Sequence, residues 1–384
     1  MPFEFLKRKK TGELFEADVV RNWYKARVYV IDKLKGFAFL PNEKRHLHVV
    51  VMDVDDKDAR PLMLSVVRQV ALSAHYINYK EDAADDLEKN RTLITIVSNN
   101  EDEIIEELRK EEYLFLLPDY GKDFFKGGNK EHKDGCPNVE VDLELKIDVR
   151  KPDDANVVMT REDVNGYLNK EENKIYEIDT RKALLADRMY KIGSDIDNLP
   201  YEHIHDTERY SVALNVFQNK KMPDKDEKLI QSEWKDNQIK VLEGISNIIC
   251  SDCFESRERS VKKYFNKLEK AAKEEKKIKK EKDAWQALIT ELSKSEHARW
   301  IVEKLIFGYR PLNTEQRYKY ESLFGNKRKE YANELKRSKE IDSLAHIDLC
   351  SYADLRRIDP DNMKYDSFLM LGIPGILKYV GKNA

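Results

Sequence analysis

The stretch that decides the fold lies near the end of the chain and reads Glu296-His297-Ala298-Arg299-Trp300-Ile301-Val302-Glu303-Lys304-Leu305-Ile306-Phe307-Gly308-Tyr309-Arg310. It has the spacing of an amphipathic helix, because Trp300, Leu305 and Phe307 share one side with Ile289 and Leu292 upstream. We therefore predict a helix whose apolar side faces a core.

Charged residues and a glycine define this helix further. Glu296, Arg299 and Glu303 follow one another at intervals of three and four residues, so they can pair along one flank. Gly308 stands where a helix usually stops, because glycine takes the left-handed conformation at little cost. Beyond it, we expect the chain to leave in an extended direction.

A second group of spaced residues follows downstream, namely Ala345-His346-Ile347-Asp348-Leu349-Cys350-Ser351-Tyr352-Ala353-Asp354-Leu355, then Asp359, Tyr365-Asp366 and Gly372-Ile373-Pro374. Together the two groups resemble the ryanodine-receptor repeat domain, or RyR domain. Its pattern runs approximately E-H-x-R-W, E-K-L, G-W/Y, H-x-D-L-x-x-Y-x-x-L, D and I-P. The resemblance covers about the last quarter of the chain in the family's order. The segment 317–341 departs from it, being longer and more charged than the usual linker.

The RyR resemblance implies a ligand site. The receptor's own repeats form paired folds with a cleft, and an adenine nucleotide has been associated with that kind of cleft. Aromatic side chains suit adenine stacking, and an arginine suits phosphate. Carried onto this sequence, the expected ligand-binding residues are Trp300, Tyr309, Arg310 and Tyr352, followed by His297 and Arg299. This chain shows a single repeat, so a homodimer would supply the second half.

Length and composition bound the remaining possibilities. A chain of 384 residues has room for two or three domains, and 37% of its residues are charged. The 69 Lys and Arg residues nearly balance the 72 Asp and Glu residues, which argues against a nucleic-acid-binding protein. No apolar run is long enough to cross a membrane. The basic run near Met1 is not followed by an apolar stretch, so we do not expect it to act as a secretory signal. Four cysteines fit a reducing, cytoplasmic environment.

Ahead of the RyR-like region, residues 47–150 have the pattern of a Rossmann-like parallel sheet. We predict strands at Leu47–Met52, Leu93–Val97, Tyr113–Leu117 and, on an edge, Val139–Ile147, with helices at Pro61–Ala74 and Asp102–Lys110. This β-α-β-α-β order implies parallel strands. Residues 1–46 are predicted to be an extension that packs on this domain, with a strand or short helix over Val19–Ile31.

The loop after the first predicted strand departs from the dinucleotide-binding pattern. A similarity to TrkA-N-like domains at His75-Tyr76-Ile77-Asn78 would imply such a fold. However, Asp53, Asp55 and Asp58 stand at the three positions that need glycine, where the backbone would approach a pyrophosphate. These carboxylates repel phosphate. We therefore expect the domain to be degenerate, with no NAD and no other cofactor.

The same aspartates allow an enzymatic alternative. Haloacid-dehalogenase phosphatases carry a D-x-D after a hydrophobic strand, which would make Asp53 the nucleophile and Asp55 the general acid beside Mg²⁺. The downstream lysine and paired aspartates of that family are not evident, and Asp55 and Asp56 can equally cap the following helix. Cys250 and Cys253 are interpreted as ordinary thiols, because zinc needs four ligands. No metal site and no catalytic residues are predicted.

The middle of the chain is predicted to be mostly helical. We expect a middle region over 151–255, with its clearest helices at Lys182–Ile192 and Thr207–Phe217. The last region, 256–384, begins with one long helix from Ser256 to Ile306. Its apolar stripe comprises Val261, Phe265, Leu268, Ala272, Trp285, Leu288 and Leu292. Because this stripe exceeds what one small domain would cover, it also favours a homodimer.

These patterns predict an α/β protein: a degenerate Rossmann-like domain, a helical middle and a C-terminal RyR domain. The expected function is non-catalytic binding of a small, adenine-containing nucleotide signal. The resemblance places such proteins in bacterial nucleotide signalling, including antiviral defence. Two alternatives stay open. One is an enzyme, either of Rossmann type or a Mg²⁺-dependent phosphatase using Asp53 and Asp55, and the other is a structural adaptor.

Overall fold

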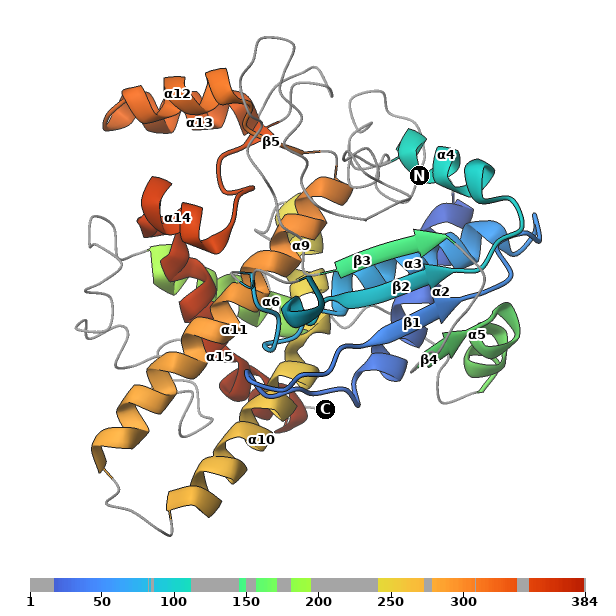
Figure 1. Cartoon of the computed structure of the whole chain (residues 1–384), viewed down its shortest axis with the longest axis horizontal. Coiled ribbons are helices and arrows are strands. Elements are labelled where there is room, and N and C mark those ends of the chain that lie inside the picture. Colours follow the sequence, from blue (N-terminus) through green and yellow to red (C-terminus); the bar gives the residue numbers. More distant parts are fainter. Residues whose placement is uncertain are drawn as a thin grey trace.

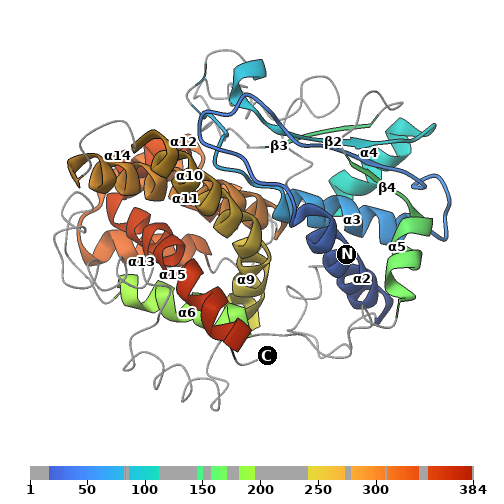
Figure 2. The ribbon, with the colours of Figure 1, turned by 90° about the horizontal axis from the view of Figure 1, so that it is seen from below.

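The computed structural model describes residues 17–81, 83, 86–111, 145–149, 157–170, 181–194, 241–272, 278–307, 309–336 and 345–382. A parallel sheet with its helices lies on one side of the molecule, and a group of helices lies on the other (Figures 1 and 2). The combination confirms the predicted α/β class.

The four strands of the larger sheet are β1 His48–Val51, β2 Thr92–Ile96, β3 Leu145–Val149 and β4 Val157–Met159. All their pairings are parallel and the order across the sheet is β3-β2-β1-β4. All four residues of β1 are buried, as expected for a β-branched run at the centre of a sheet. The strands predicted at Leu47–Met52 and Leu93–Val97 are therefore confirmed.

The sheet continues beyond residue 150, the predicted end of this domain. β4 pairs with β1, and β3 lies on the opposite edge, within and just after the predicted edge strand Val139–Ile147. The three-residue β4 is too short to give a periodic signal, so the sequence placed it in a helical region. The strand predicted at Tyr113–Leu117 lies outside the described residues.

Among the described residues, the helices that accompany the sheet are α2 Ala17–Leu34, α3 Arg60–Ser73, α4 Glu101–Glu111 and α5 Arg161–Leu168, together with the short η1 Asp86–Lys89. α3 packs against β1 and β2, and α2 packs against α3. Pro61 occupies the first turn of α3, where its missing N–H costs nothing. The predicted extension thus contains a helix that packs on the next unit through buried Trp23 and Tyr29.

The helical side of the molecule is built from α6 Arg181–Ser194, α9 Val241–Asp252, α10 Phe254–Ala272, α11 Ile278–Ile306 and α15 Met363–Lys382. α6 and α15 pack closely. Gly372 of α15 permits this close approach, because a Cβ added at that position would collide with the Met189 side chain of α6. The helix predicted at Lys182–Ile192 corresponds to α6. The helix predicted at Thr207–Phe217 lies outside the described residues.

The prediction of a single long helix from Ser256 to Ile306 is wrong in one respect. α10 ends at Ala272 and α11 begins at Ile278, so two helices replace one. Three stripe residues, Val261, Leu288 and Leu292, are buried in a cluster with residues of α6 and α15. The chain itself therefore covers this part of the stripe, and the argument for a homodimer loses that support.

A small subdomain completes the C-terminal region. It contains β5 Arg310–Pro311, α12 Thr314–Ser322, α13 Asn326–Lys336, β6 Ala345–His346, α14 Tyr352–Ile358 and η6 Pro360–Asn362. β5 and β6 pair in parallel, which brings the residues after α11 beside those before α14. The two sequence groups of the RyR resemblance therefore meet in space.

Candidate functional site

The second half of α11 carries a buried ion network. Arg299 donates to Glu296 at 2.8 Å and to Glu303 at 2.6 Å, which confirms the predicted pairing along one flank. Arg257 of α10 donates to Glu296 at 2.5 Å, and Ser246 of α9 donates to Glu303 at 2.7 Å. The side chains of Glu296, Arg299 and Glu303 are 0–1% exposed. The network therefore joins α11 to α9 and α10.

This geometry gives Arg299 a structural role. Burial disfavours the charged form of Glu296, but Arg299 and Arg257 outweigh it and lower the pKa of Glu296 to about 2. The carboxylate is thus ionised between two guanidinium groups. Arg299, which the sequence analysis named as a ligand-binding residue, is committed to these ion pairs and is closed off from solvent.

Four of the predicted ligand-binding residues meet in one aromatic cluster, which also contains His346. The ring of His297 lies 6.1 Å from that of Trp300 and 5.6 Å from that of Tyr352. His346 lies 4.7 Å from Trp300 and 6.0 Å from Tyr309. His346 was noted as part of the RyR pattern, but the sequence did not indicate that it would join these rings.

His297 is held as a neutral imidazole. Its Nε2 lies 3.0 Å from the carbonyl oxygen of Cys350, which can only accept, so Nε2 carries the proton. Burial lowers the pKa of His297 to about 4. The other ring nitrogen faces Asp366 at 3.7 Å, and burial raises the pKa of that carboxyl well above its usual range.

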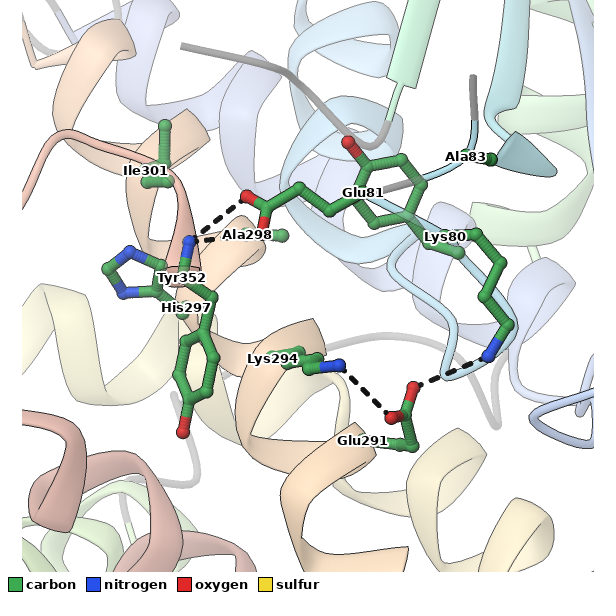
Figure 3. Close-up of a pocket in the computed structure, with 10 residues that line it drawn as sticks. Lys80, Glu81, Ala83, Glu291, Lys294, His297, Ala298, Ile301 and Tyr352 are labelled. Atoms are coloured by element: carbon green, nitrogen blue, oxygen red, sulfur yellow. Dashed lines mark hydrogen bonds and ion pairs between the residues drawn. The ribbon is translucent and has the colours of Figure 1, made fainter. Parts of the chain in front are cut away.

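A cavity of about 270 Å³ lies beside the aromatic cluster, between α11 and the segment that follows α3. Its walls combine aromatic, charged and apolar side chains (Figure 3), contributed by Tyr79, Lys80, Glu81, Ala83, Glu291, Lys294, His297, Ala298, Ile301 and Tyr352. His297 and Tyr352 therefore line the cavity, whereas Trp300, Tyr309, Arg310 and Arg299 are not among its lining residues. Arg310 is half-buried in β5.

One ion pair and one backbone contact connect the walls of this cavity. Glu291 of α11 accepts from Lys294 at 3.2 Å and from Lys80 at 3.5 Å. The carboxylate of Glu81 accepts from the backbone N–H of Tyr352 at 3.0 and 3.1 Å, at the start of α14. Residues of the α/β side thus contact both α11 and the C-terminal subdomain.

Sequence reasoning missed most of the cavity residues. Four of them lie on the same helix as His297, at intervals of three and four residues: Glu291, Lys294, Ala298 and Ile301. This helical spacing could have identified the face of the helix that lines the cavity. The segment from Tyr79 to Ala83 carries no such signal, because it has no repeating pattern. Its position depends on Asn78, whose side-chain amide donates to the carbonyl groups of Glu43 and Arg45.

At the carboxyl end of the sheet, each aspartate of the predicted D-x-D segment has a separate partner. Asp53 accepts from the backbone N–H of Arg161 at 2.8 Å, at the start of α5. Asp55 accepts from the Ser98 hydroxyl and the Asn99 backbone, which lower the pKa of Asp55. Among the described residues no three His, Cys, Asp or Glu side chains lie where they could hold a metal ion.

The other residues that the sequence singled out, Asp56, Cys250 and Cys253, have structural rather than catalytic surroundings. Asp56 accepts from the backbone N–H groups of Asp58 and Ala59, in the turn before α3. The N-cap of α3 is Ala59, without a side-chain cap hydrogen bond, so the prediction that Asp55 or Asp56 caps this helix is wrong. Cys250 and Cys253 are buried free thiols, and burial raises the pKa of Cys253 to about 12. Both thiols therefore stay protonated at neutral pH and do not act as nucleophiles.

Comparisons of this chain with protein-family models, with curated proteins and with solved structures find no match. Among the helices of the described residues, none combines the length and apolar character needed to cross a membrane.

Proposed function

We propose that this protein is a non-catalytic, nucleotide-binding regulatory protein and that its ligand occupies the cavity beside His297 and Tyr352. The supporting observation is the cavity itself, which joins an aromatic ring, a neutral imidazole and two lysines between the α/β side and the C-terminal region. In this proposal the C-terminal region is an RyR domain, as its sequence resemblance implies.

The lining chemistry suits a flat base with an anionic tail. Ala298 and Ile301 give one apolar wall, and the ring of Tyr352 offers a surface for stacking. The carboxylate of Glu81 can accept from an exocyclic amine such as that of adenine. Lys80 and Lys294 supply positive charge for phosphate.

The rest of the proposal follows from the RyR resemblance. It places the protein in bacterial nucleotide signalling, including antiviral defence, with a homodimer as the expected assembly. The enzyme and adaptor alternatives are weighed by the same experiment. The partners of Asp53 and Asp55 give those carboxylates structural roles, which favours binding over phosphatase chemistry.

The test is calorimetry and thermal melting of the purified full-length chain with an adenine nucleotide panel. We expect a binder that raises the melting temperature, since a ligand at about 100 times its Kd stabilises the folded state by about 2.7 kcal/mol. Ala83→Trp fills the cavity and abolishes binding. Ala287→Trp, at an exposed position on α11, is the matched control and leaves binding unchanged.

Arg310→Ala locates the ligand. If the nucleotide occupies the cavity, this variant binds within a few-fold of the parent protein. If the phosphate instead binds at Arg310, the loss of a charge-assisted contact weakens binding about tenfold or more. A panel with no binder at all contradicts the proposal and favours the structural adaptor.

A further inference from the structure

Two lysines approach one carboxylate from different parts of the molecule. Lys294 and Glu291 are one turn apart on α11, whereas Lys80 comes from the segment after α3 on the facing wall. Figure 3 shows Glu291 between the two ammonium groups. Both lysine side chains and the carboxylate are partly exposed, at 36%, 35% and 21%. Such ion pairs contribute little to stability and are readily exchanged.

We propose that Lys80 and Lys294 form the phosphate-binding pair of this cavity, and that Glu291 holds their places in the free protein. This inference rests on the proposed function and names its ligand class, a nucleoside monophosphate. Two ammonium groups and one carboxylate leave one positive charge at this end of the cavity. A phosphate dianion that displaces Glu291 meets both lysines at once.

The size of the cavity restricts the ligand. Pockets for drug-sized ligands enclose roughly 300–1,000 Å³. The present cavity, at about 270 Å³, lies just below that range. One base, one sugar and one phosphate match this space better than a dinucleotide or a triphosphate. At the other end Glu81, bound to the Tyr352 backbone, disfavours a second phosphate.

Titration calorimetry on the full-length protein tests the inference with adenosine, adenosine 5′-monophosphate (AMP), adenosine 5′-carboxylate, ATP and NAD. We expect AMP to bind about tenfold more tightly than adenosine, as charge-assisted contacts require. Lys80→Ala and Lys294→Ala each remove this preference and leave adenosine binding unchanged. Lys262→Ala on α10 is the control, because this exposed lysine pairs with Glu258 and is not among the residues that line the cavity.

Glu291→Gln gives the sharpest outcome, because it removes the carboxylate that competes with phosphate. We expect this variant to bind AMP more tightly than the parent protein while adenosine binding stays the same. A purely structural Glu291 would instead lower or leave unchanged the affinity for AMP, and that result overturns the inference.

The remaining outcomes separate this inference from the proposed function. If adenosine and AMP bind equally, or the carboxylate analogue binds as tightly as AMP, the phosphate pair is wrong while nucleotide binding stands. Preferential binding of ATP or NAD, abolished by Ala83→Trp, contradicts the monophosphate class alone. If none of these probes binds, both the proposed function and this inference fail.

Discussion

Glu296 illustrates how a single residue can organise the helical side of the molecule. Its buried carboxylate lies between Arg257 of α10 and Arg299 of α11, and both ion pairs are almost fully removed from solvent. Taking charges out of water is costly, so such a pair stabilises the fold only while each charge keeps its partner. The network therefore favours one arrangement of the two helices.

We predict that Glu296→Gln destabilises the protein by about 3–5 kcal/mol, the usual cost of breaking a buried ion pair. Glutamine keeps the volume but removes the carboxylate that pairs with Arg257, and it leaves Arg299 with Glu303 as its counter-charge. The measurement is urea unfolding at pH 7. Glu103→Gln is the control, because that exposed glutamate also pairs with an arginine, Arg60, and its loss should barely move the midpoint. Equal midpoints for both variants would contradict this role.

Asp348 gives a pH-dependent prediction. Burial raises the pKa of this carboxyl to about 6, so the folded state favours its protonated form. The resulting stability is present below about pH 4 and is lost as the pH rises through about 6. Asp348→Asn removes that loss, and its amide oxygen can still accept from Asn362.

Relative to the parent protein, Asp348→Asn should therefore gain about 2–3 kcal/mol between pH 4 and pH 8. Denaturant unfolding of both proteins at several pH values measures the difference. A difference that does not vary with pH would mean that Asp348 is ionised in the fold with an ordinary pKa.

At the scale of elements, the sequence predicted those parts whose pattern is local. The runs at Leu47–Met52 and Leu93–Val97 are strands because β-branched residues are buried there, and α6 and α11 follow from helical periodicity. Features that depend on distant partners could not be predicted. β4 needs β1 beside it, and the cavity needs the segment after α3 to meet α11.

The same limit applies to the candidate site. Spacing and the RyR resemblance indicated His297, Trp300, Tyr309 and Tyr352, and these rings do converge. Whether Arg299 faces a ligand or a core depends in part on Arg257, which lies on the preceding helix, α10. A charged residue on an amphipathic helix therefore gives no sign of its burial until the helices around it are placed.

The β1–α3 loop provides a test at this scale. Asp53 has a left-handed backbone conformation, with φ of 64°, at the position where dinucleotide-binding loops use glycine. Aspartate and asparagine tolerate this region, whereas a β-branched side chain does not. The carboxylate of Asp53 also accepts from the Arg161 backbone at the start of α5.

We predict that Asp53→Asn changes stability by no more than about 1 kcal/mol and leaves nucleotide binding intact, because the amide oxygen can replace the carboxylate. Asp53→Val should destabilise the protein by about 2 kcal/mol, through backbone strain and the lost hydrogen bond. Thermal unfolding of the two variants gives the comparison. A Mg²⁺-dependent phosphatase activity that disappears in Asp53→Asn would instead support the enzyme alternative.

At the scale of the whole molecule, α3 lies at the junction of the two sides. Thirteen of its residues are buried, and it contacts α2, β1 and β2 as well as α9 and α11. Burial extends to polar side chains such as Arg60, Arg68 and Gln69, so neighbouring elements enclose this helix on all sides. The homodimer stays a prediction, and light scattering that gives the 45.2 kDa mass of one chain would contradict it.

The cavity spans the same junction, and this determines how a ligand would act. Its walls come from the segment after α3, from α11 and from the start of α14. In the free protein, the sides are linked here by the Lys80–Glu291 ion pair and by Glu81 on the Tyr352 backbone. A nucleotide that contacts both walls adds further links between them.

We therefore predict that saturating AMP slows amide hydrogen exchange at two separate places, the segment 79–81 and the first turn of α14, in addition to α11. Amides that exchange through local opening of α5 should be unaffected, because α5 contacts α2 and does not line the cavity. Lys80→Ala should restrict the protection to α11 and α14. Mass spectrometry of exchange in the full-length protein measures all three regions. Protection confined to α11 in the parent protein would mean that the ligand contacts one wall only and does not couple the two sides.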